Sequence, residues 1–84
     1  MIDATEIADV IEDMCDRVDP GELITANDVW SVIGHDATLA HPNGTMGRGF
    51  TLARKAGLIE ATGEVTKSDH PKRKHGMIMK WRVL

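Results

Sequence analysis

The spacing between apolar residues changes once along this chain, from the three-and-four spacing of a helix to the alternation of a strand. The helical run near the N-terminus is Ile7, Val10, Ile11, Met14 and Val18. The alternating run near the C-terminus is Met77, Met79, Trp81 and Val83. Helical spacing collects apolar side chains on one helix face, whereas alternation collects them on one face of a half-buried strand. The sequence therefore predicts an α+β fold in which helices precede strands.

Capping pairs mark the starts of two expected helices. Asp3 is followed three residues later by Glu6, and Thr25 is followed three residues later by Asp28. In such a pair the first side chain accepts from the helix backbone, and the second reaches back to the capping residue. We therefore expect one helix after Asp3 and another after Thr25, the latter stopped by Gly34.

A third helix and several strands follow from the remaining pattern. Asn43 is expected to cap a helix that runs to about Ala56. Leu23 and Ile24 form a short apolar stretch that suits a brief strand. Residues 58–61 and 64–68 are expected to form two separate strands before the alternating C-terminal strand. The methionines of that strand, with Met14 and Met46, are expected to fill gaps in the core.

Length and cysteine content limit the class of protein. The chain has 84 residues, so residues 1–84 are expected to form a single domain with one small core. Cys15 is the only cysteine, which excludes an internal disulfide and a cysteine-cluster zinc site. No apolar run approaches the roughly 20 residues of a membrane span. The acidic N-terminus is unlike a signal peptide, so we expect a cytoplasmic protein with no membrane partner.

Charge is distributed unevenly between the two halves of the chain. Residues 1–42 carry ten acidic residues and one basic residue (net −9), whereas residues 43–84 carry nine basic and three acidic residues (net +6). One interpretation is that the second half faces a polyanion such as nucleic acid. The other is that the two halves attract each other. The basic run Lys72-Arg73-Lys74, between the last two expected strands, favours nucleic acid because each neutralised phosphate releases a counterion.

Three stretches together resemble a winged helix-turn-helix domain. They are ITANDVWSVIG (24–34), GRGFTLARKAGLIEATG (47–63) and SDHPKRKHGMIMKWRVL (68–84). The first resembles the opening helix of the turn motif, the second a recognition helix that leads into a strand, and the third a basic wing. The resemblance covers about residues 5–84. It implies a winged helix, with a three-helix bundle followed by a C-terminal β-hairpin wing.

The resemblance also implies a binding face for double-stranded DNA. The third helix would enter the major groove, and the wing would lie on the backbone or in the minor groove. The positions implied to face the groove are Asn43, Thr45, Arg48, Thr51 and Lys55. The positions implied on the wing are Lys67, Lys72, Arg73 and Lys74, with His70 and His75 as further candidates. No cofactor is implied.

More narrowly, the chain resembles small stand-alone winged-helix proteins of actinobacteria and their phages. That resemblance implies a role in transcription regulation or as a phage-encoded DNA-binding factor. Gly44, Gly47 and Gly49 would let the third helix approach the DNA backbone closely, or else let it pack closely on another helix. Trp30 and Trp81 fit the core better than a base-stacking role, because both are in phase with apolar neighbours.

Other classes of function remain as alternatives or find little support. The acidic N-terminal helix would repel DNA, so it either faces solvent, binds a protein partner or forms a homodimer. A winged-helix module that docks on a host transcription or replication protein is therefore the alternative function. A basic face also does not distinguish DNA from RNA. No nucleophile stands in a pattern with a histidine and a carboxylate, and His35, His41, His70 and His75 lack metal-ligand spacing, so neither an enzyme nor a metal site is expected.

Overall fold

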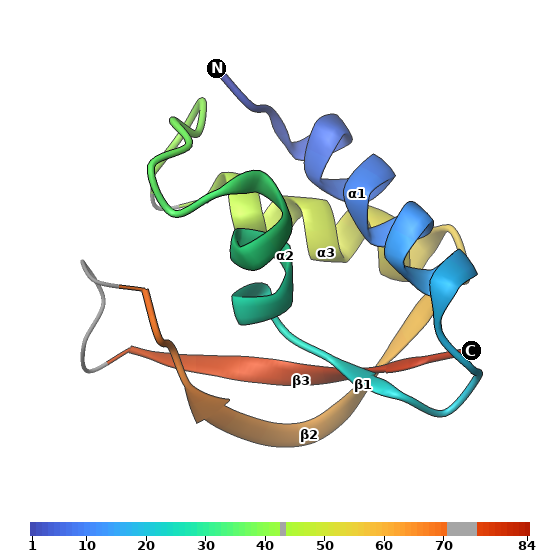
Figure 1. The fold of residues 1–84 in the computed structure, drawn as a ribbon. Helices are drawn as coiled ribbons and strands as arrows, with labels where there is room; N and C mark the ends of the chain where they lie inside the picture. Colours follow the sequence, from blue (N-terminus) through green and yellow to red (C-terminus); the bar gives the residue numbers. More distant parts are fainter. Residues whose placement is uncertain (43, 71–75) are drawn as a thin grey trace.

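The computed structural model describes residues 1–42, 44–70 and 76–84, and these residues form an α+β fold. In chain order the elements are α1 (Ala4–Arg17), β1 (Leu23–Ile24), α2 (Ala26–Ile33), α3 (Thr45–Lys55), β2 (Ile59–Lys67) and β3 (Met77–Val83). The helices form one layer and the sheet forms a second layer against them (Figure 1). The expected class, with helices before the main strands, is confirmed.

The sheet is antiparallel and places β3 between the other two strands, in the order β1-β3-β2. β1 pairs with the C-terminal end of β3, with Ile24 opposite Trp81. The short strand expected at Leu23 and Ile24 is therefore present, and it anchors the start of α2 to the sheet. Just before β1, the Gly21 N–H also donates to the Val83 carbonyl of β3 at 2.7 Å.

β2 is one long strand, so the prediction of separate strands at 58–61 and 64–68 was wrong. Its pairing with β3 is irregular between Ala61 and Val65, where Gly63 adopts a φ of 81°. The Thr62 hydroxyl donates to the Lys80 carbonyl at 2.9 Å across this irregularity. Gly63 tolerates a positive φ, and the Thr62 side chain makes a hydrogen bond to β3 at this point. The strand can therefore bend without ending.

Asp3 and Thr25 cap the first two helices as predicted, but the reciprocal contact of a capping box is found at Asp28 and not at Glu6, and α3 begins differently. Asp3 accepts from the Glu6 backbone N–H at 2.9 Å, and Thr25 with Asp28 forms a complete capping box. The N-cap of α3 is Gly44, and among the described residues no side-chain hydrogen bond caps this helix. The predicted cap, Asn43, lies outside the described residues, and the expected start of the helix was one residue too early.

The core lies between α1, α2, α3 and the sheet. Its fully buried members include Ile7 and Ile11 from α1, Val29 from α2 and Ile59 from β2. Gly49 of α3 lies directly against Ile7, so close that a Cβ built at position 49 would overlap the Ile7 side chain. This glycine therefore serves close helix packing, which was one of the two interpretations of the glycines in this helix.

The methionines of β3 depart from the predicted core. Met77 and Met79 are 57% and 42% exposed, although Trp81 and Val83 in the same alternating run are half-buried and buried. The predicted phase holds at Trp81 and Val83, but at the start of the strand Ile78 and Lys80 are half-buried and the methionines are exposed, so the prediction for Met77 and Met79 was wrong. Met14 and Met46 are half-buried against the core, and Trp30 is buried, as expected.

None of the described helices is long and apolar enough to cross a membrane.

Candidate nucleic-acid interface

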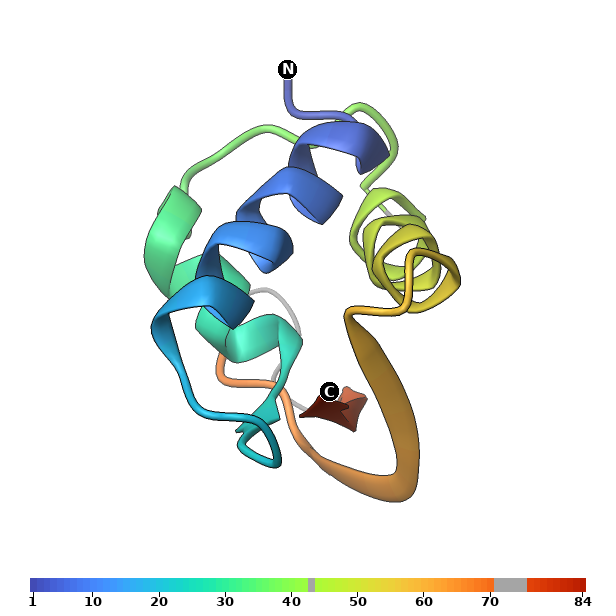
Figure 2. The ribbon, with the colours of Figure 1, turned by 90° about the vertical axis from the view of Figure 1, so that its right-hand side faces the viewer.

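One side of α3 is exposed from Gly47 to the end of the helix and carries all of its charged side chains. Arg48, Thr51, Arg54 and Lys55 are all exposed, whereas Gly49, Phe50 and Ala53 are buried. Helical spacing puts Thr51 near the centre of the exposed side, with the three cations around it. Figure 2 shows α3 and β2 along one side of the molecule, away from α2. We call Arg48, Thr51, Arg54 and Lys55 the α3 surface.

Thr45, a predicted groove-facing residue, is not part of this surface. It is only 2% exposed, and its hydroxyl oxygen accepts from the His41 backbone N–H at 2.8 Å. Positions 45, 49 and 53 recur at a spacing of four, so they share one side of the helix. That side carries the contact between Gly49 and Ile7 of α1. The prediction for Thr45 was wrong because the helix presents this side to α1.

The Thr51 hydroxyl is already engaged within the helix. It donates to the Gly47 carbonyl, one turn earlier, at 3.0 Å. Its proton is therefore used locally, and the oxygen remains available as an acceptor on the exposed side. A contact from Thr51 to a ligand would be to a donor group or through its methyl group.

Arg54 belongs to the α3 surface, although it was not among the predicted binding residues. It lies three residues after Thr51, close to one helical turn, and is exposed. The 3.6-residue period would have placed it there from the sequence alone.

The cations of the α3 surface, like Lys67, have no carboxylate partner among the described residues, whereas Arg17, Lys80 and Arg82 each have one. Arg82 pairs with Glu60 at 2.9 Å, Lys80 with Glu64 at 3.8 Å, and Arg17 with Asp13 at 3.1 Å. Among the described residues no ion pair within 4.0 Å involves Arg48, Arg54, Lys55 or Lys67. The positive potential of the α3 surface is therefore not cancelled by a direct carboxylate contact.

Of the predicted wing residues, only Lys67 and His70 lie within the described residues. Lys67 is exposed at the end of β2, opposite Met77 of β3. Lys72, Arg73, Lys74 and His75 fall outside the described part. The structure therefore positions the base of the predicted wing and one of its cations.

His70 is buried, so the expectation that it contacts phosphate was wrong. It is 7% exposed, and its ring lies 4.3 Å from the Trp30 ring and 5.5 Å from the His35 ring, centroid to centroid. His35 in turn approaches Asp69 at 3.7 Å. The pattern of alternating residues did not reveal this cluster, because its members come from α2 and from two connecting segments far apart in the sequence.

Asn27 of α2 is a further contact that the sequence did not indicate. Its side-chain nitrogen donates to the Lys67 carbonyl at 3.1 Å, and its side-chain oxygen accepts from the Asp69 backbone N–H at 3.0 Å. A carboxamide has this donor and acceptor pair side by side. The base of the predicted wing is thereby fastened to α2.

The acidic residues of α1 occupy its exposed sides. Asp9, Glu12, Asp13 and Asp16 are exposed, whereas Ile7 faces the core. Only Asp13 of these four takes part in an ion pair among the described residues. α1 packs on α3 through the buried side of α3, so the acids do not cover the α3 surface.

Cys15 and the histidines form no metal-binding cluster in the described part of the chain. Burial, and then the nearby carboxylates of Asp16 and Glu12, raise the pKa of the Cys15 thiol, which favours the unreactive protonated form. Its Sγ lies 3.9 Å from the Leu58 carbonyl oxygen. Among the described residues, no three histidine, cysteine or acidic side chains gather where they could hold a metal ion.

Comparisons of the chain with protein-family models, with curated proteins and with solved structures each found no match. The candidate interface therefore depends on the geometry of this chain alone.

Proposed function

We propose that this protein is a winged-helix protein that binds double-stranded DNA, with α3 in the major groove and the β2–β3 hairpin on the backbone or in the minor groove. The observation that carries the proposal is the α3 surface. Its three cations, Arg48, Arg54 and Lys55, are exposed on one helix and have no carboxylate partner among the described residues. Such a row of cations is the footprint expected of a helix that approaches phosphates.

The element order supports the winged-helix assignment. Three helices are followed by the antiparallel pair β2 and β3, as the resemblance of the sequence implies. The contact of Gly49 with Ile7 holds α3 by its buried side, which leaves the opposite side free to enter a groove. A protein of this kind would act as a regulator of transcription or as another DNA-bound factor.

The three cations of the α3 surface have different expected roles. Arg48 lies in the first turn of α3, and the N-terminal residues of a recognition helix are the ones that reach base edges. Its guanidinium can donate two hydrogen bonds to a guanine. Arg54 and Lys55 lie in the last turn, where contact with phosphate is expected.

The first test is fluorescence anisotropy of a labelled mixed-sequence duplex, titrated with the protein over a series of salt concentrations. With five or six phosphate contacts, the logarithm of the affinity should fall with the logarithm of salt at a slope of about −5. Replacing Arg48, Arg54 and Lys55 together by alanine should make that slope shallower by about 2 to 3. The matched control is Arg17→Ala, which removes an exposed cation from α1, far in sequence from the proposed face.

The predicted wing is tested in the same assay by replacing Lys72, Arg73 and Lys74 together by alanine. Relative to the wild type, we expect this variant to bind DNA more weakly and with a shallower salt slope, while its melting temperature is unchanged. An unaltered slope would remove the wing from the proposed interface. Arg17→Ala removes one charge and the triple variant of α3 removes three. An effect of Arg17→Ala about one third as large as that of the triple variant would show that only overall charge matters, which contradicts the proposed face.

A second candidate function is a protein-docking module, favoured by the exposed acids Asp9, Glu12, Asp13 and Asp16 of α1. Flat anisotropy even at low salt would exclude DNA binding as proposed and support this candidate. Sedimentation equilibrium would then separate a homodimer from a protein that awaits another partner.

A further inference from the structure

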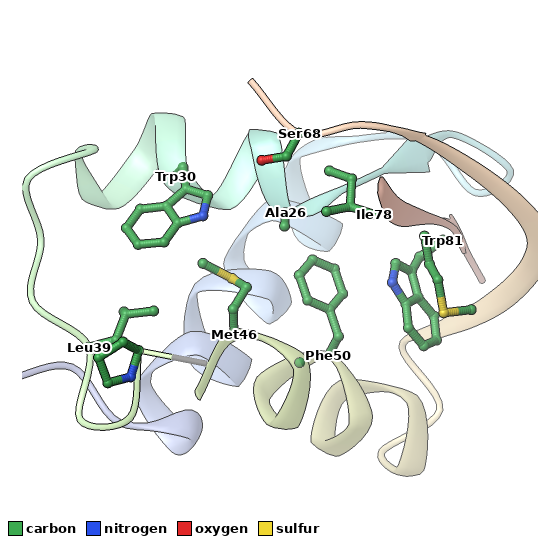
Figure 3. Close-up of a pocket in the computed structure, with 11 residues that line it drawn as sticks. Ala26, Trp30, Leu39, Met46, Phe50, Ser68, Ile78 and Trp81 are labelled. Atoms are coloured by element: carbon green, nitrogen blue, oxygen red, sulfur yellow. The ribbon is translucent and has the colours of Figure 1, made fainter. Parts of the chain in front are cut away.

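An apolar pocket lies between the helices and the sheet (Figure 3). Its volume is about 170 Å³. Trp30 of α2, Met46 and Phe50 of α3, and Met79 and Trp81 of β3 contribute to its walls. Figure 3 shows Trp30 and Trp81 on opposite sides, with Met46 and Phe50 extending from α3 between them. The pocket thus joins three elements that are otherwise separate in the chain.

The walls of the pocket suit a ligand with a flat aromatic ring. The rings of Phe50 and Trp81 are nearly parallel, 19° apart, with centroids 5.6 Å from each other. Trp30 adds a third aromatic side chain. Aromatic rings pack well on one another in offset or tilted arrangements, so such walls favour an aromatic guest. A dry apolar cavity of about 150 Å³ in another protein binds benzene, so the size here is suitable for one aromatic ring.

One polar group at the wall can orient such a ligand. Ser68 is 7% exposed and lines the pocket, and its oxygen accepts from the His70 backbone N–H at 3.3 Å. Within the described part of the chain, no acceptor is found for the Ser68 hydroxyl proton. A ligand that carries an oxygen acceptor can receive this proton.

The lining also restricts the charge of a ligand. None of the pocket-lining residues in the described segments carries a charge. An ionised ligand would lose its hydration without gaining an ionic partner, which is costly. From the volume, the aromatic walls and Ser68, we propose that this pocket binds a small uncharged aromatic molecule of about one ring, with its polar group against Ser68. The proposal does not depend on DNA binding.

Phenol is the probe for the first test. It is titrated into the ¹⁵N-labelled protein while the indole N–H signals of Trp30 and Trp81 are followed by NMR. We expect both signals to shift and saturate, with a dissociation constant on the order of 1 mM or below. Melting temperature should rise with phenol concentration, because a ligand of the native state stabilises it by mass action. Shifts that stay linear, or that spread over the surface without reaching these two signals, would overturn the proposal.

A pocket-filling substitution locates the site. Ala26 lines the pocket and is half-buried, so Ala26→Leu should occupy part of the volume and weaken phenol binding at least tenfold. The matched control is Ala56→Leu, at an exposed position outside the pocket lining, which should leave the dissociation constant unchanged. Equal affinities in the two variants would contradict this site.

A second pair of measurements applies even if Ala26→Leu does not fold. Ser68→Ala should weaken phenol binding about 2- to 10-fold, the usual range for one neutral hydrogen bond, and should leave toluene binding unchanged. Equal effects on the two probes would contradict the role of Ser68 in orienting the ligand.

Discussion

The carboxamide of Asn27, on α2, holds the end of β2 through the backbone carbonyl of Lys67, which lies 3.1 Å from Asn27 Nδ2. The oxygen of the same side chain accepts from the Asp69 N–H at 3.0 Å. One side chain thus satisfies a backbone acceptor and a backbone donor at the end of β2, where Lys67 is still paired with Met77. This arrangement connects the proposed wing to α2 at Lys67, the last residue of β2.

Replacement of Asn27 by alanine should loosen this connection. Two hydrogen bonds are lost, at a cost of about 1–2 kcal/mol in the free energy of unfolding, with partial compensation by water because the site is half-exposed. The Asp69 amide should exchange its hydrogen faster, as NMR would measure. Asn27→Asp is the control, since it keeps the acceptor for Asp69 and loses only the donor to Lys67. Equal protection of the Asp69 amide in Asn27→Ala and the wild type would contradict this role.

Two glycines of α3 should respond to alanine in opposite ways. A Cβ at position 49 would overlap the Ile7 side chain and lie 3.2 Å from the Ala4 carbonyl oxygen, whereas one at position 47 would meet nothing within 4 Å. Gly49→Ala should therefore lower the free energy of unfolding by about 1–3 kcal/mol, the usual cost of overpacking. Gly47→Ala should raise it by about 0.5–1 kcal/mol, through the better helix propensity of alanine. Urea denaturation measures both, and changes of the same sign would contradict the packing described.

The raised pKa of the Cys15 thiol should make stability depend on pH in the alkaline range. The folded protein holds the proton more tightly than the unfolded chain, whose thiol has the ordinary pKa of 9.0. This contribution is therefore fully present below that value and decreases as pH rises through the folded pKa. We expect the wild type to lose stability relative to Cys15→Ser in urea melts as the pH rises above 9.0, the ordinary pKa of the thiol. A constant difference over this range would show that Cys15 has the same pKa in both states.

The sequence predicted the elements that depend on local chemistry. The capping box of Thr25 and Asp28, the stop at Gly34 and the strand at Leu23 and Ile24 each depend on adjacent residues. The exposure of Met77 and Met79 was not predictable in the same way. Alternation predicts one buried side for the whole strand, but at its start the half-buried residues are Ile78 and Lys80, because burial there depends on contacts with distant parts of the chain.

The candidate site was predictable in part for a similar reason. The helical period correctly predicted that Arg48, Thr51 and Lys55 are exposed. The same period also places Arg54 on this exposed side. The burial of Thr45 depends on which side of α3 meets α1, which is decided by the fit of Gly49 against Ile7. That fit is a contact between distant parts of the chain, so no local pattern could reveal it. The cluster of Trp30, His35 and His70 is hidden from the sequence in the same way.

Arg48 and Arg54 should differ in what they contribute to DNA binding, because they lie at opposite ends of α3. If Arg48 donates two hydrogen bonds to a guanine, Arg48→Lys keeps the charge and loses the paired geometry. The ratio of affinities for a selected site and a scrambled duplex should then fall by about 5- to 150-fold, corresponding to about 1–3 kcal/mol of base discrimination. A phosphate contact from Arg54 predicts that Arg54→Lys leaves this ratio unchanged.

The corresponding alanine variants separate base reading from charge. Arg54→Ala should weaken binding to both duplexes equally and reduce the salt slope by about 1. Arg48→Ala should lower the affinity ratio as Arg48→Lys does, because the lost discrimination comes from geometry and not from charge. A ratio that changes in the Arg54 variants but not in the Arg48 variants would mean that the C-terminal end of α3, not its first turn, meets the bases. The helix would then have to enter the groove in the opposite orientation.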